Sequence, residues 1–520
     1  MQIGMQLVRA LAVSGLALGM TLSIQADPLT VKTELGKAHG KTINDGKVNA
    51  FLGLPYAASP AGDMRWKAPA PPAKWAGERD ATKFGPHCAQ GHVFDDMVFQ
   101  DNGESEDCLS LNVYAPADAT KKSKLPVMFW IHGGGYSGGS GNEPRHNGDF
   151  LPLKGVVLVT INYRLGVFGF LATSEMAKEA NGVAGNYGLM DMVAALEWVK
   201  ANIGAFGGDP GNVTIFGESA GSAAVSTLIA SPMAKGLFQK GIGESGGALG
   251  TGLLGQDGLE AYLKKGDKWV ESTGAKSLAE LRAMPADKIL DAVKKSRGGF
   301  GPDVDGKFLT ESVASVYAAG TQAKVPLIAG WNRDEGYYQS IGMTAAKWKA
   351  QAGKLFGDRA DAFLKLYAGD TDEQAIEAAG DYGADSFIAF STWKWIEAHR
   401  KTSGEPTYRY HFELRATPSK YHQGTWAFHS DDIEYVFGTL DTRPGWTVRP
   451  EDRQLSEQMM SYWTNFAKTG DPNGAGLPTW PKYDKDDSLI HLNTTITSGP
   501  DKLRARYEFL VEGMPARGAN

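Results

Sequence analysis

The sequence lacks the features that mark several large classes of protein. Its 53 basic residues do not outnumber its 59 acidic ones, and the net charge of -6 leaves no bulk positive field for nucleic acid or anionic membranes. No repeat, low-complexity tract or Ser/Pro-rich linker divides the 520 residues. Beyond the N-terminus, no apolar run is long enough to span a bilayer. Hydrophobic residues still make up 42% of the chain, so we expect a globular protein with a large core and no nucleic-acid partner.

The N-terminus carries the one long apolar run. Arg9 is the only charged residue before Asp27, and Ala10–Ile24 follows it as a run of apolar and small residues. This run is shorter than the about 20 residues of a transmembrane helix, and Ala26 is suited to precede a cleavage site. We therefore expect residues 1–26 to be a signal peptide, with an uncleaved anchor as the alternative. The mature chain, residues 27–520, would be secreted or periplasmic and would have no integral membrane span.

Cysteine is scarce, since only Cys88 and Cys108 occur. Two cysteines behind an export signal favour one disulfide bond. The sequence contains neither a Cys-x-x-Cys pair nor a Cys/His spacing typical of zinc sites. We therefore expect no metal site, and nothing in the sequence indicates a cofactor.

Apolar runs bounded by glycine alternate with segments of helical periodicity. Near-continuous apolar runs are typical of parallel strands that are buried on both faces. Their alternation with helices predicts an α/β fold, with a large, mostly parallel central sheet, helices on both faces and helical insertions. The predicted strands are Leu125–His132, Val156–Tyr163, Val213–Gly217 and Val325–Trp331; the predicted helices are Leu189–Ile203 and Met459–Thr469, with a helix-rich insertion near Leu259–Lys295.

A Gly-x-Ser-x-Gly pattern occurs three times, and its context separates the three copies. Such a serine acts as a nucleophile when it lies on a tight turn between a strand and a helix, where the flanking positions have no room for side chains. Only Gly217–Gly221 follows a β-branched apolar segment and precedes a helix-compatible one. We predict that Ser219 is the nucleophile. Ser137 and Ser245 are interpreted as loop serines, either of which can still line the pocket.

A glycine triplet follows a predicted strand upstream of this turn, in His132–Gly135. A hydrolase that forms a tetrahedral intermediate needs N–H donors aimed at the developing oxyanion, and consecutive glycines let the backbone approach it closely. We expect the amides of Gly134, Gly135 and Ala220 to form an oxyanion hole. By itself the triplet is equally compatible with a flexible turn.

These stretches together resemble the type-B carboxylesterase family, which includes bacterial para-nitrobenzyl esterases and cholinesterases. The resemblance extends from about residue 28 to about residue 485. It implies the α/β-hydrolase fold, one carboxylesterase catalytic domain over residues 27–520, and a small-molecule ester as substrate. The motifs that carry it are Phe51–Trp75, Glu106–Pro116, Trp130–Gly139, Ile161–Phe170 and Phe206–Gly221.

The resemblance also assigns the base and the acid of a catalytic triad. His422 and His429 cannot be separated by reasoning from the residues alone, but the segment FHSDDIEYVFG is similar to the histidine segment of the family and implies His429. The family's Asp-Glu-Gly segment implies Glu335 as the acid, with Asp334 as a neighbour or structural partner. The order Ser219, Glu335, His429 is the order of α/β-hydrolases.

The loop between the two cysteines matches the first disulfide loop of the family, with one informative departure. Cholinesterases have a tryptophan there that holds a quaternary ammonium group by a cation–π contact. This chain has Val98 in the corresponding region and no tryptophan in the loop, so choline esters are not the expected substrates. Glu244 replaces the glutamine that often precedes Ser245 in the family, and we expect it to disfavour anionic substrates if it lies near the pocket.

The sequence thus predicts a serine hydrolase that cleaves carboxylic esters through an acyl-enzyme intermediate. This prediction has two alternatives. A non-catalytic adhesion or binding member of the same fold would not need an intact triad and glycine loop. An interfacial lipase would need an amphipathic lid, and the disulfide loop has apolar residues such as Phe94 and Val98 among acidic ones. The natural ester, its acyl and alcohol parts and the oligomeric state are left open.

Overall fold

A computed structural model describes residues 29–514, apart from residues 93, 251–257, 297–298 and 485. The predicted signal peptide, residues 1–26, lies outside the described residues. In the part of the chain that is described, no helix has the length and apolar character needed to cross a membrane.

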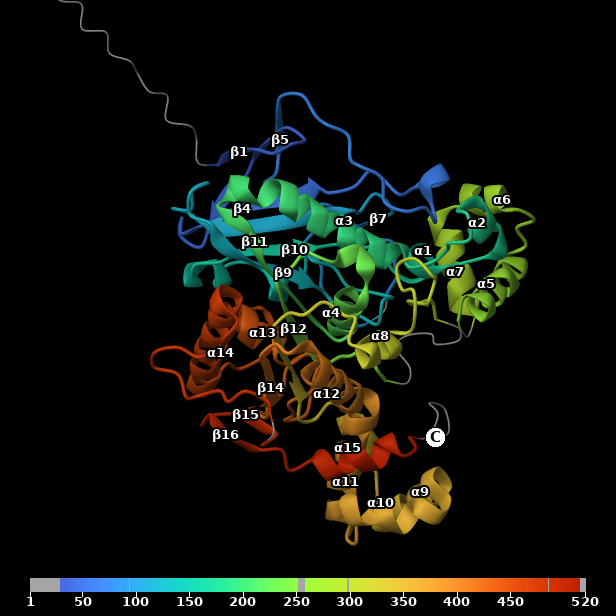
Figure 1. Ribbon diagram of the computed structural model, residues 1–520, viewed down its shortest axis with the longest axis vertical. Helices are drawn as coiled ribbons and strands as arrows, with labels where there is room; N and C mark the ends of the chain where they lie inside the picture. Colours follow the sequence, from blue (N-terminus) through green and yellow to red (C-terminus); the bar gives the residue numbers. More distant parts are fainter. Residues whose placement is uncertain (1–28, 93, 251–257, 297–298, 485, 515–520) are drawn as a thin grey trace, which may run out of the picture.

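An eleven-stranded sheet forms the centre of the molecule (Figure 1). Its strand order is β16-β15-β14-β13-β12-β11-β9-β10-β8-β4-β3. The strands from β15 to β10 in this order pair in parallel, while the strands at both edges pair antiparallel. The members are β3 (Lys41–Ile43), β4 (Val48–Pro55), β8 (Ser110–Pro116), β9 (Leu125–Ile131), β10 (Val157–Ile161), β11 (Gly208–Glu218), β12 (Lys240–Glu244), β13 (Leu327–Asn332), β14 (Thr407–Phe412), β15 (Ser488–Leu492) and β16 (Thr497–Pro500).

Two small sheets flank the N-terminal half of the large one. One contains three strands in the order β1-β2-β5, and the other pairs β6 with β7. Their bounds are β1 (Thr30–Lys32), β2 (Lys37–His39), β5 (Glu78–Asp80), β6 (His87–Cys88) and β7 (Glu104–Ser105).

The central strands are apolar throughout because both of their faces are covered. In β9, Met128 and Trp130 belong to one hydrophobic cluster, while Phe129 and Ile131 belong to a second cluster on the opposite face. All four side chains have no exposed surface. Successive side chains of a strand point to opposite faces, so a strand between two helical layers needs apolar residues at every position.

Helices form the two layers that bury the sheet. The buried residues of α3, α4, α8 and α12 belong to the cluster on one face, and those of α13 and α14 belong to the cluster on the other. The α-helices are α1 (Gly166–Phe170), α2 (Ser174–Glu179), α3 (Tyr187–Asn202), α4 (Ala220–Ala230), α5 (Gly258–Thr273), α6 (Leu278–Ala283), α7 (Ala286–Lys295), α8 (Val313–Ala319), α9 (Ala345–Phe356), α10 (Ala360–Leu366), α11 (Asp372–Ala384), α12 (Phe390–Ser403), α13 (Ile433–Phe437), α14 (Pro450–Thr469) and α15 (Arg504–Val511).

The predicted α/β architecture is confirmed, with differences at the element boundaries. Each of the four predicted strands is present as β9, β10, β11 or β13, and the insertion near Leu259–Lys295 consists of α5, α6 and α7, which group beside α2 (Figure 1). The predicted late helix is wrong at its start, because α14 begins at Pro450 rather than at Met459. Proline is favoured in the first turn of a helix, where its missing N–H would have no partner.

Candidate active site

Ser219 lies on a sharp turn between β11 and α4. Its φ of 56° and ψ of -119° are a strained combination for a residue that carries a side chain. The turn is possible because both flanking positions are glycine. A Cβ atom would lie 2.5 Å from the carbonyl oxygen of Ile131 if built on Gly217, and 2.0 Å from it if built on Gly221. The backbone N–H of Ser219 donates a hydrogen bond of 2.8 Å to the Glu244 carbonyl oxygen, which fixes the turn to strand β12.

His429 brings an imidazole to this serine. It lies in the loop that leads into α13, and its Nε2 is 2.8 Å from the Ser219 Oγ. On its other side, Nδ1 is 2.6 Å from Oε2 of Glu335. One ring thus bridges a hydroxyl and a carboxylate, the arrangement in which an imidazole can move a proton from the hydroxyl while the carboxylate fixes its tautomer.

Glu335 is held by two further hydrogen bonds. It follows β13, and its Oε1 accepts the Asn332 N–H at 2.9 Å and the hydroxyl of Ser245. These donors fix the carboxylate in a site where it is almost completely buried. The neighbouring Asp334 faces elsewhere, because its two carboxylate oxygens accept a bidentate pair of hydrogen bonds from Arg415, at 2.8 and 2.9 Å.

The glycine loop after β9 lies against the serine. A Cβ built on Gly133 would be 3.1 Å from the Cβ of Ser219, and one built on Gly134 would be 2.2 Å from a carbonyl oxygen of the same loop. Gly134 also has a φ of 101°, which only glycine adopts readily. Among the hydrogen bonds of the described residues, none uses the N–H of Gly134, Gly135 or Ala220 as a donor. These three N–H groups have no protein acceptor among the described residues and are therefore available to a ligand.

Two acidic residues determine the charge of the imidazole. Burial lowers the pKa of His429, but the nearby carboxylates of Glu218 and Glu335 outweigh this effect and raise the pKa to about 9. Glu218 directly precedes Ser219, and its Oε1 is 3.3 Å from Nε2 of the imidazole. Burial raises the pKa of Glu218 to about 8, although the histidine opposes the shift. Since the two groups titrate in the same range, the proton on one depends on the charge of the other.

The other candidate histidine, His422, lies beside the site without joining it. Its ring stacks on Phe428 with the centroids 3.6 Å apart, and its Nε2 is 4.0 Å from Asp96. Burial lowers its pKa. The structure therefore brings His429, and not His422, to the serine.

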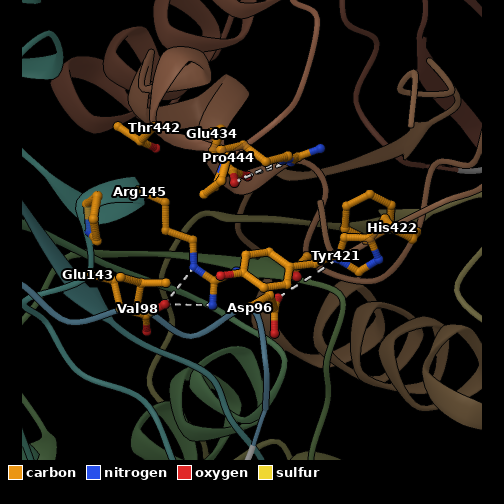
Figure 2. Close-up of a pocket in the computed structure, with 13 residues that line it drawn as sticks. Asp96, Val98, Glu143, Arg145, Tyr421, His422, Glu434, Thr442 and Pro444 are labelled. Atoms are coloured by element: carbon orange, nitrogen blue, oxygen red, sulfur yellow. Dashed lines mark hydrogen bonds and ion pairs between the residues drawn. The ribbon is translucent and has the colours of Figure 1, made fainter. Parts of the chain in front are cut away.

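A charged cavity lies next to the histidine loop (Figure 2). Its wall includes Phe428 and Ser430, the two chain neighbours of His429. Arg145 extends into the cavity wall and forms an ion pair of 2.8 Å with Glu143. The guanidinium is surrounded by acidic groups, so its positive charge is compensated within the protein.

Aromatic rings form another part of the surroundings of the imidazole. The ring of Phe387 meets that of His429 edge to face, with centroids 5.0 Å apart, and also contacts Tyr338. Nearby, Tyr337 and Trp426 stack at 5.4 Å. Half of the Tyr338 surface is exposed, so apolar surface extends from the histidine to the outside of the molecule.

The predicted disulfide bond is present between Cys88 and Cys108. Its closed loop is fixed at the base by the pairing of β6 with β7. At the other end, Phe94 and Val98 are exposed by 46% and 42%, and Val98 lines the cavity of Figure 2.

Sequence reasoning missed two contacts of the site. Ser245 was interpreted as a loop serine, yet its hydroxyl supports the carboxylate of Glu335. Glu218 was not identified as a neighbour of the imidazole, although its position directly before Ser219 was a usable signal. Glu244, expected to act on anionic substrates if near the pocket, is completely buried and accepts a hydrogen bond of 2.7 Å from the Trp463 indole.

Comparisons with known proteins agree with this geometry. Residues 27–509 match the model of the carboxylesterase family. A fumonisin B1 esterase of Sphingopyxis macrogoltabida is 35% identical over 91% of this chain and 88% of its own length, and a liver carboxylesterase of Sus scrofa is 35% identical over 90% of both chains. A solved structure of PNB esterase superimposes with a TM-score of 0.79 at 33% identity, covering 92% of this chain and 99% of its own. Because model, relatives and fold agree over most of its length, the chain belongs to the type-B carboxylesterase family, has the α/β-hydrolase fold and is a carboxylic ester hydrolase.

Proposed function

We propose that this hydrolase cleaves its ester through a Ser219–His429–Glu335 triad and a covalent acyl-enzyme intermediate. The observation that carries the proposal is the imidazole of His429, which lies within hydrogen-bond distance of both the Ser219 hydroxyl and the Glu335 carboxylate. The substrate is a small-molecule carboxylic ester, and the reaction consumes one water molecule to give an acid and an alcohol.

Acylation begins when the Ser219 Oγ attacks the ester carbonyl carbon and His429 Nε2 takes the hydroxyl proton. The carbonyl oxygen becomes an oxyanion, and the amides of Gly134, Gly135 and Ala220 are the donors that stabilise it. Loss of one such donor typically costs about 3–4 kcal/mol of transition-state stabilisation. The imidazolium then gives its proton to the leaving alcohol as the C–O bond breaks.

Deacylation repeats these steps with water. His429 removes a proton from water, the resulting hydroxide attacks the acyl carbon, and Ser219 leaves with the returned proton. Throughout, Glu335 remains ionised and stabilises the imidazolium, supported by the Ser245 hydroxyl and the Asn332 N–H.

The test is Ser219→Ala, measured on a short p-nitrophenyl ester. We expect hydrolysis to fall by a factor of about 10⁶, as when a nucleophile of such a triad is removed, with an unchanged circular dichroism spectrum. A fluorophosphonate probe should label the wild-type chain covalently and leave the variant unlabelled. Wild-type turnover by the variant would exclude Ser219 as the nucleophile.

We further propose that residues 27–520 act as a single catalytic domain that is secreted or periplasmic. The Cys88–Cys108 disulfide is compatible with an oxidising compartment. Intact-mass measurement of the exported protein tests this, because cleavage after Ala26 gives a chain that starts at Asp27. A mass that includes residues 1–26 would favour the anchor.

A further inference from the structure

Two histidines and a glutamate meet at the carboxyl ends of the last parallel strands. His411 of β14 and His491 of β15 are register partners, so their side chains lie side by side on the same face of the sheet. Glu413 is two residues after His411 and shares that face, and its N–H continues the pairing with a hydrogen bond of 2.8 Å to the Leu492 carbonyl oxygen.

The three side chains converge on a single point. Oε1 of Glu413 is 2.9 Å from Nδ1 of His411 and 2.6 Å from Nδ1 of His491. One potential ligand atom from each residue lies within 4.8 Å of one from each of the other two. Zinc binds imidazole nitrogen and carboxylate oxygen at about 2.0–2.2 Å, and tetrahedral ligands at that distance are about 3.4 Å apart. The two distances from Oε1 to the imidazole nitrogens are thus within about 1 Å of the ligand spacing around a bound ion.

The backbone holds these ligands rigidly. Two of them lie on paired strands, and the third lies in the extended segment directly after one of them. The His411 ring also packs edge to face against Trp331, a side chain with almost no exposed surface. A site built on strands keeps its geometry better than one built on loops.

A cavity of about 420 Å³ gives access to the three side chains from solvent. They are exposed by 13% (His411), 22% (Glu413) and 27% (His491). The cavity wall also contains four basic side chains and three further acidic ones, Asp381, Asp385 and Asp501. Three of the basic side chains are ion-paired: Arg409 with Asp501, Arg506 with Asp381 and Arg333 with Glu377. Their charge is thus largely compensated, and an entering cation meets no strong positive field.

From these contacts we propose that His411, Glu413 and His491 form a binding site for a divalent transition-metal ion of the zinc type. Two imidazoles and one carboxylate are ligands that suit such ions rather than calcium or magnesium. Three protein ligands leave the fourth position to water from the cavity. The two histidines are 80 residues apart in the sequence, so no spacing motif marks the site.

The bound ion would connect β14 to β15 close to the segment that carries Glu335. The carbonyl oxygen of Phe412 accepts a 2.9 Å hydrogen bond from the N–H of Arg333, two residues before that acid. We therefore expect the ion to stabilise this end of the sheet, and not to take part in ester hydrolysis.

The test is calorimetric titration of the full mature chain with ZnCl₂ after removal of metals with a chelator. The wild type should bind one Zn²⁺ per chain, and a concentration 100-fold above Kd should raise Tm by about 3 °C. His491→Gln and Glu413→Gln should each weaken binding by at least about tenfold, because even the outer partners of metal ligands contribute 10- to 100-fold. Circular dichroism reports whether each variant folds. If one of the two variants does not fold, the other still tests the proposal.

The matched control is His92→Gln, since His92 and Asp95 form an exposed imidazole–carboxylate pair outside the cluster. This control should bind zinc as the wild type does. Absence of stoichiometric binding by the wild type, or equal affinity in His491→Gln and Glu413→Gln, would overturn the proposal. Because binding is measured directly, its outcome is independent of whether Ser219 is the nucleophile.

Discussion

At the scale of single residues, the charge around His429 is the feature with the clearest functional consequence. In the proposed mechanism, the imidazole must be neutral to accept the proton of Ser219. Its pKa is raised to about 9, so kcat/KM should increase with pH and reach half of its maximum in the alkaline range.

Replacement of Glu218 tests this electrostatic origin. The anion attracts the protonated imidazole and so raises its pKa, and Glu218→Gln removes that attraction while preserving size. The pKa of His429 should fall, and the rising limb of the pH profile of kcat/KM should move to lower pH. If the rising limb of the kcat/KM profile lies at the same pH in Glu218→Gln as in the wild type, Glu218 does not raise the pKa of the imidazole.

Glu335 and Asp334 provide a matched pair of adjacent acids. Glu335→Gln keeps the size of the side chain but removes the charge next to the imidazole Nδ1. If Glu335 is the acid of the proposed triad, kcat should fall by about 10⁴, as it does when the acid of a Ser-His-Asp triad is replaced by its amide. Asp334→Asn removes a charge one residue away that is paired with Arg415, and it should keep kcat within about tenfold. Equal losses in the two variants would contradict the assigned roles.

The residues of the candidate site differ in how far the sequence alone predicts them. The strand-to-helix turn at Ser219 was predictable because strand, turn and helix are local in the sequence. His429 and Glu335 needed the family resemblance, since no local pattern brings residues from β11, β13 and the α13 loop together. Ser245 and the His411 cluster were not predicted, because their partners are 80 or more residues distant and only strand pairing brings them together.

At the scale of the elements, the strand-to-helix turn at Ser219 depends on close backbone contact. Alanine at an ordinary helix position stabilises a helix relative to glycine by about 1 kcal/mol. Gly221 is the opposite case, because a Cβ there would lie 2.0 Å from the Ile131 carbonyl oxygen.

Gly221→Ala should therefore lower the free energy of unfolding by about 1–3 kcal/mol, the usual cost of overpacking, and reduce kcat as the turn shifts. Gly353→Ala in α9 is the control, since no atom lies within 4 Å of the Cβ position there. It should leave activity unchanged and add about 0.5–1 kcal/mol of stability. Thermal or urea unfolding measures the free energy of unfolding of both variants. If Gly221→Ala and Gly353→Ala change this free energy in the same direction, the prediction is wrong.

The elements themselves were largely predictable, because burial on both faces makes the central strands apolar at every position. The residues at which these helices and strands begin and end were less predictable. The pattern of Met459–Thr469 gave only the second half of α14, since the first half carries the charged residues Glu451, Asp452 and Arg453 on its more polar turns. Helix periodicity is weak where a helix begins at the surface.

At the scale of the whole molecule, the disulfide loop is the one covalent constraint on a chain that is otherwise held together by its two apolar layers. It closes a loop with a sequence separation of 20 between Cys88 and Cys108. Cross-linking a loop of this length restricts the unfolded chain and contributes about 3 kcal/mol in the chain-entropy account.

The double variant Cys88→Ala/Cys108→Ala should therefore lose about 3 kcal/mol of stability, which corresponds to a fall in Tm of about 3 °C for a chain of this size. The large core remains intact, so the variant should still fold and hydrolyse a small ester at 25 °C.

The loop also carries Phe94 and Val98, so we expect KM to rise for bulky esters more than for short ones. Differential scanning calorimetry and a paired ester assay measure both effects, and a reductant should shift the Tm of the wild type but not that of the variant. If the variant unfolds at the wild-type temperature, the loop is ordered by its packing alone and the disulfide contributes nothing to the global stability.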